Sequence, residues 1–91
     1  MRNIDLRGRT VVVANVGGQF FAIDGRCTSD GANLANGDLR GFIVRCPGQG
    51  EEFDLRTGKV VNEPWGNSHK ANDLRIYPVF LQDGCIYADI T

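Results

Sequence analysis

The chain lacks several features that would place it in a common functional class. It is 91 residues long, and no window shows the apolar period of an amphipathic helix between capping residues. Ten Lys and Arg nearly balance eleven Asp and Glu, so no strong field draws nucleic acid or an anionic membrane. No apolar run reaches the ~18 residues of a membrane span, and the N-terminus lacks a signal-peptide segment. These absences predict a cytoplasmic protein that binds neither nucleic acid nor membrane.

Signatures of hydrolytic catalysis are also missing. The sequence has one histidine, and it contains no Ser-His-Asp spacing, phosphate-binding glycine loop or zinc pattern. Glu51 and Glu52 are adjacent, so in a strand they point to opposite faces and are poor candidates for paired acid–base work. The sequence assigns no catalytic residue and leaves open whether the chain is an enzyme.

What is present is a pattern of short strands and tight turns. Twelve glycines and frequent turn signals predict one all-β domain over residues 1–91, a sandwich or barrel. Three hairpins are expected, the first around Gly17-Gly18, the second around residues 56–59 and the third around Asp83-Gly84. In the last strand Ile86, Ala88 and Ile90 alternate with other residues, which predicts that this aliphatic set faces the core.

Two of the three cysteines begin short motifs. Cys27-Thr28-Ser29 and Cys46-Pro47-Gly48-Gln49 are separated by sixteen residues. Further blocks at 21–28, 31–34, 53–61, 74–79 and 83–87 stand in the same order and spacing as in Rieske-type ferredoxins, and the chain resembles that family over nearly its whole length. The resemblance implies a Rieske-type antiparallel β-sandwich or barrel with a two-loop cluster-binding subdomain at about residues 26–62.

In the family, a Cys-x-His loop and a Cys-x-x-His loop hold a two-iron, two-sulfur cluster, with the cysteines on one iron and the histidines on the other. Here both cysteines are present, but Ser29 and Gln49 replace the histidines. A hydroxyl binds iron weakly unless deprotonated, and a carboxamide offers only a neutral oxygen. We therefore expect no ordinary Rieske cluster and predict no cofactor. The alternative is a 2Fe-2S cluster kept by substitute ligands, with Cys27 and Cys46 as metal ligands.

Without a cluster, the two cysteines have three alternative fates. A Cys27–Cys46 disulfide would close a loop of about twenty residues and contribute ~3 kcal/mol, although a reducing cytoplasm opposes it. A mononuclear or shared metal site could recruit ligands from a second chain. Two buried free thiols acting as small apolar groups are the third alternative. Cys85 is expected to serve packing alone.

A small-molecule pocket is a further hypothesis. Residues 62–73 correspond to the family's loop over the cluster and carry the single Trp and the single His. An aromatic wall with a few polar groups is typical of ligand pockets. The candidate lining residues are Ser29, Asp30, Gln49, Trp65 and His69. Otherwise Trp65 packs on the sheet and His69 is solvated.

These observations favour a non-redox descendant of the family: an accessory, small-molecule-binding or repurposed catalytic domain that uses the former cluster pocket. The alternative is an electron carrier for an oxygenase system, and a third possibility is a deliberately made ligand-substitution variant. The partner would be a small molecule or a redox or oxygenase protein. The short N-terminal strand leaves a sheet edge that a partner or a second copy of the chain could cover, so a homo-oligomer stays open.

Overall fold

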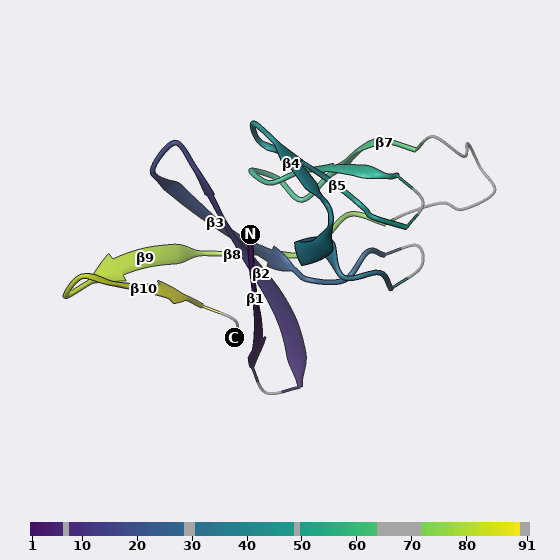
Figure 1. The fold of residues 1–91 in the computed structure, drawn as a ribbon. Coiled ribbons are helices and arrows are strands. Elements are labelled where there is room, and N and C mark those ends of the chain that lie inside the picture. Colours follow the sequence, from purple (N-terminus) through teal and green to yellow (C-terminus); the bar gives the residue numbers. More distant parts are fainter. Residues whose placement is uncertain (7, 29–30, 49, 64–71, 90–91) are drawn as a thin grey trace.

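The computed structural model describes residues 1–6, 8–28, 31–48, 50–63 and 72–89, and these form three antiparallel sheets (Figure 1). The first sheet has the strand order β1-β2-β3-β8, the second has the order β4-β5-β6-β7, and β9 pairs with β10. The elements are β1 (Arg2–Leu6), β2 (Arg9–Val16), β3 (Gln19–Asp24), the 3-10 turn η1 (Leu34–Asn36), β4 (Asp38–Arg40), β5 (Ile43–Arg45), β6 (Glu52–Asp54), β7 (Val60–Asn62), β8 (Ile76–Tyr77), β9 (Val79–Gln82) and β10 (Cys85–Ala88). The all-β prediction is confirmed. Among these residues no helix has the length and apolar character needed to cross a membrane.

The hairpin of β2 and β3 is the centre of the first sheet. Its register pairs Val16 with Gln19, and the two residues between them, Gly17 and Gly18, have φ angles of 59° and 91°. Such positive φ values suit the tight turn that matches the strand twist, and glycine adopts them without strain. The Gly18 N–H also donates to Asn15 Oδ1 at 3.0 Å. The predicted hairpin is confirmed. It was predictable because the residues of the turn themselves specify its geometry.

The main core lies between the first two sheets and includes both motif cysteines. Its members share near-complete burial and are Val12, Ala14, Ile23, Cys27, Leu34, Val44, Cys46, Phe53, Leu55 and Leu74. On β2 the alternate residues Val12 and Ala14 face this core, whereas Val11 belongs to a smaller cluster on the other face. The residues that position Cys27 and Cys46 are therefore the same residues that hold the two sheets together.

Phe53, on β6, is a test of this shared core. Its side chain is 0% exposed, so Phe53→Ala is expected to lower the free energy of unfolding by about 3–5 kcal/mol through lost burial and the cavity left behind. Phe80→Ala is the matched control, since Phe80 is 49% exposed, and its loss should be much smaller. Urea unfolding followed by circular dichroism measures both. Equal losses would contradict the placement of Phe53 at the centre of the core.

The β8 strand returns the chain to the first sheet beside β3. Ile76 and Tyr77 pair with Ile23 and Ala22, and the Asp24 N–H donates to the Arg75 carbonyl at 2.9 Å. The Tyr77 hydroxyl donates to Asp24 Oδ1. Burial, and then this hydrogen bond, raises the pKa of the Tyr77 hydroxyl. These contacts hold the end of β3 in place just before the chain enters the first cysteine loop.

The β9–β10 hairpin is a two-stranded sheet of its own, and it extends to one side of the rest of the fold (Figure 1). Asp83 and Gly84 form its turn with φ angles of 53° and 77°, so the third predicted hairpin is confirmed. The prediction that Ile86 faces the core is wrong, since its side chain is 41% exposed. Ala88 is half-buried, and Ile90 lies outside the described residues. Alternation separates the two faces of a strand, but it does not say whether another layer covers either face.

Candidate functional site

The first cysteine loop begins where β3 ends. The Gly25 N–H donates to the Thr10 carbonyl at 2.8 Å, which ties the start of the loop to β2. The Cys27 N–H then donates to the Ala32 carbonyl at 2.8 Å, and the Gly31 N–H donates to the Cys27 carbonyl at 2.9 Å. The backbone of Cys27 is thus held through both its N–H and its C=O, which limits the directions its side chain can take.

The second cysteine loop joins β5 to β6. Arg45 pairs with Glu52 in the ladder, and one step further the Cys46 N–H donates to the Glu51 carbonyl at 2.8 Å. The backbone of Gly37 packs closely against Arg45 at the base of this loop. A Cβ at position 37 would lie only 2.0 Å from the Arg45 carbonyl oxygen. The absence of a side chain at Gly37 therefore lets the backbone approach the base of the loop, and Cys46 and Glu51 are held opposite each other.

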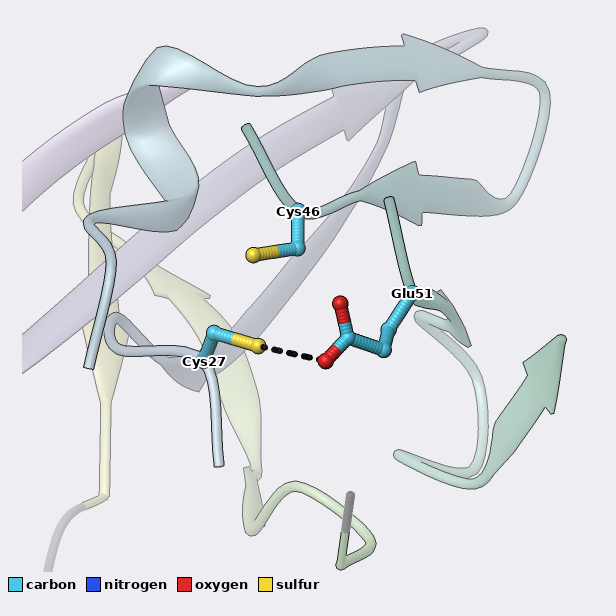
Figure 2. A group of neighbouring side chains, drawn as sticks. All are labelled: Cys27, Cys46 and Glu51. Atoms are coloured by element: carbon cyan, nitrogen blue, oxygen red, sulfur yellow. Dashed lines mark hydrogen bonds between the residues drawn. The ribbon is translucent and has the colours of Figure 1, made fainter. Parts of the chain in front are cut away.

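The two loops bring three ligand-type side chains together in the core. Cys27, Cys46 and Glu51 are 3%, 2% and 1% exposed, and one ligand atom from each lies within 4.8 Å of the other two. Figure 2 shows their side chains pointing toward one another from separate segments of the chain. The Cys27 thiol donates to Glu51 Oε2, with 4.0 Å between the two atoms. We call this group the Cys2Glu triad.

The chemistry of the triad favours metal binding. Cysteine thiolates are soft ligands that suit iron–sulfur clusters and zinc, and a carboxylate oxygen is also an accepted ligand for zinc and iron. A buried carboxylate is costly unless it is hydrogen-bonded, paired with a charge or bound to a metal, and Glu51 is the buried charged side chain of the described residues. The cysteine pair fits the half of a Rieske cluster in which two thiolates bind one iron.

The structure brings the two cysteines together as the resemblance implies, and no disulfide joins them. Cys85, which is expected to serve packing alone, is an exposed thiol on β10. The five candidate pocket residues, Ser29, Asp30, Gln49, Trp65 and His69, all lie outside the described residues, so their pocket stays a prediction.

Beside Cys46 the described residues line a cavity of about 310 Å³, formed by Gly37, Asp38, Arg45, Cys46, Pro47, Gly48 and Gly50.

Glu51 is the member of the triad that sequence reasoning missed. The expected alternation holds, since Glu51 is buried while Glu52 is half-buried and accepts a hydrogen bond from Asn62 Nδ2 at 2.8 Å. The sequence did contain a signal, a glutamate just past the Cys-x-x-Gln motif. That signal does not say which of the two adjacent glutamates points inward, and only the packing of the second loop on the first decides it.

Comparison with known proteins identifies this two-loop arrangement. The family model described as the Rieske [2Fe-2S] domain matches residues 1–78. The chain belongs to this family. A ferredoxin subunit of 3-phenylpropionate/cinnamic acid dioxygenase from Photorhabdus laumondii is 37% identical over 75 residues, which cover 81% of this chain and 67% of the relative.

Solved structures agree with this assignment of the Rieske family. A chain in a complex of reduced oxygenase and oxidized ferredoxin in carbazole 1,9a-dioxygenase matches 97% of this chain and 86% of its own length, with a TM-score of 0.86 and 28% identity. A ferredoxin of Sphingomonas yanoikuyae B1 matches 98% of this chain and 85% of its own, with a TM-score of 0.83 and 29% identity. The expectation of a Rieske-type fold is confirmed.

Membership of this family corrects one prediction outright. The expectation that the chain has no cofactor is wrong, because it belongs to a family of [2Fe-2S] domains and is similar to ferredoxin subunits. That prediction gave too much weight to the two missing histidines. The same findings support the electron-carrier alternative better than the non-redox interpretation.

Proposed function

We propose that this chain is the ferredoxin component of an oxygenase system and carries single electrons to the oxygenase. The observation that carries the proposal is the pair of buried thiols, Cys27 and Cys46, in the two loops of a Rieske domain. The relatives named as ferredoxin subunits of a dioxygenase support it. In this proposal residues 1–91 act as one domain with the cluster loops at about 26–62, in the cytoplasm.

The protein's task in such a carrier is to hold and shield the metal centre. Cys27 and Cys46 would bind one iron of a [2Fe-2S] cluster, which supplies reversible one-electron chemistry when bound. The backbone hydrogen bonds at both cysteines fix the directions of the two sulfurs. The surrounding core, which includes Leu34 and Phe53, excludes water from them, and low solvent exposure is one of the factors that set a cluster's reduction potential.

The tip of the second loop is the proposed contact with the partner. Cys46 is buried, but the next two residues, Pro47 and Gly48, are exposed and line the 310 Å³ cavity. A partner that docks on this tip would therefore lie close to the Cys46 sulfur. Redox partners form small, transient interfaces, often below about 1,200 Å² in total, and a small exposed loop tip suits that kind of encounter.

Preparation of the full chain under anaerobic conditions tests the proposal. We expect two irons and two acid-labile sulfides per chain, visible absorption that bleaches with dithionite, and an electron paramagnetic signal after reduction. The reduced protein should then be reoxidised by the oxygenase component of a 3-phenylpropionate-type dioxygenase, measured as recovery of visible absorption. Omission of the oxygenase is the control. A colourless chain with neither iron nor sulfide would show that it is not an electron carrier.

A further inference from the structure

The cysteine pair accounts for the protein ligands of one iron, and the sequence has no histidine at the two positions that would serve the other. We propose that Glu51 is a third protein ligand of the metal centre that Cys27 and Cys46 hold. The inference rests on the proposed function where it concerns an iron–sulfur cluster. Its test with a single metal ion does not require the cluster.

The distances within the Cys2Glu triad fit ligation of a metal. Metal–sulfur bonds of about 2.3 Å and metal–oxygen bonds of about 2.1 Å place neighbouring donor atoms of a tetrahedral ion about 3.6–3.8 Å apart. The Cys27 Sγ to Glu51 Oε2 distance is 4.0 Å, and all three donor atoms lie within 4.8 Å of one another. Small changes in side-chain torsions would therefore bring Glu51 onto a metal bound by the cysteines.

The burial of Glu51 supports the same role. A carboxylate at 1% exposure is costly to bury, and a bound cation offsets that cost. Neighbouring Glu52 keeps partial contact with solvent and bonds to Asn62, as surface carboxylates ordinarily do. Of the two adjacent glutamates, the chain buries the one that points at the cysteines.

The backbone also ties Glu51 to a ligand. The Cys46 N–H donates to the Glu51 carbonyl at 2.8 Å, so the two residues keep their relative position when the side chains move. The second loop thus supplies two donors, Cys46 and Glu51, and the first loop supplies Cys27. Removal of Glu51 should weaken metal binding without disturbing the backbone that presents the two thiols.

Two isosteric variants test the proposal: Glu51→Gln, and Glu52→Gln as its matched control. Co²⁺ alone is the probe, added under anaerobic conditions to the metal-free full chain and followed by its visible d–d bands and its thiolate charge-transfer band. Loss of even an outer-shell partner costs about 10- to 100-fold in metal affinity. Glu51→Gln should therefore weaken Co²⁺ binding by at least tenfold and shift the d–d bands, whereas Glu52→Gln should match the wild type.

Stability of the metal-free chain separates ligation from a purely structural role. Glu51→Gln replaces a buried carboxyl by a neutral amide of the same shape, so its urea midpoint without metal should equal or exceed that of the wild type. If Glu51 only supports the fold, the midpoint falls and the Co²⁺ spectrum of the folded fraction stays unchanged, which overturns the proposal. A wild type that binds no Co²⁺ overturns it as well.

The iron-loaded protein distinguishes this inference from the proposed function. Suppose that the wild type carries the cluster and that Glu51→Gln changes neither the paramagnetic g-values of the cluster nor the Co²⁺ affinity. The proposal that Glu51 is a ligand is then wrong, and the electron-carrier proposal stands. If wild type holds no iron and sulfide, the electron carrier fails. The Co²⁺ comparison of Glu51→Gln with Glu52→Gln then decides the ligand role by itself.

Discussion

Replacement of Cys46 by alanine is expected to remove the metal centre. One of the two thiolates on an iron is then lost, and the remaining Cys27 cannot hold that iron alone. Since loss of an outer-shell partner already costs about 10- to 100-fold in metal affinity, loss of a ligand should cost at least as much. Bound iron should fall from two per chain toward none, with a parallel loss of sulfide and of visible absorption. Metal analysis and absorption spectroscopy measure the change.

Cys85→Ala is the control for this experiment, because Cys85 is an exposed thiol on the separate β9–β10 hairpin. It should keep the full iron content. Circular dichroism must show that Cys46→Ala is folded, since Cys46 is also part of the core. A folded Cys46→Ala chain that retains iron and sulfide at the wild-type level would remove Cys46 from the metal site and with it the main support for the electron-carrier proposal.

The second large effect is expected on the reduction potential. Clusters with two histidines on one iron lie at about −150 to +300 mV, whereas all-thiolate plant-type ferredoxins lie near −400 mV. In this chain neither histidine position holds an imidazole and the Glu51 carboxylate lies beside the two cysteines, and an anionic donor disfavours the added electron. We therefore expect the wild type below about −150 mV, and Ser29→His with Gln49→His above it. Potentiometric titration followed by visible absorption gives both values.

Gln82→His provides a matched control, because it adds a histidine at an exposed position of β9 without touching the cysteine loops. Its potential should equal that of the wild type. Two results would contradict the prediction: a wild-type potential already inside the two-histidine range, or a cluster-bearing double variant with an unchanged potential. Either would mean that the missing histidines and the Glu51 carboxylate do not set the potential here.

Together these predictions describe a Rieske carrier whose ligand set differs from the one expected for the family. The two cysteines and the fold around them match a [2Fe-2S] domain, while the histidine positions hold a hydroxyl and an amide. A buried carboxylate stands beside the cysteines. A lower potential would make the reduced protein a stronger electron donor to the proposed oxygenase partner.

The local features of this protein were predictable from its residue types. The hairpins at Gly17-Gly18 and Asp83-Gly84 follow from turn residues that tolerate positive φ, and such preferences act over a few residues. The two cysteine motifs and the blocks around them carry the family resemblance, which implied the fold and the pair of thiols that meet in its core. Each of these features depends on residue type and order alone.

Which faces of the strands are covered depends on how segments distant in the chain pack against one another in the fold. Alternation separates Glu51 from Glu52 and Ile86 from Tyr87, but it does not say which side another layer will cover. The meeting of the two cysteine loops buried Glu51, and the separation of the β9–β10 hairpin left Ile86 and Cys85 exposed. Burial depends on contacts between segments far apart in the chain, and for that reason the third member of the Cys2Glu triad came from the fold and not from a motif.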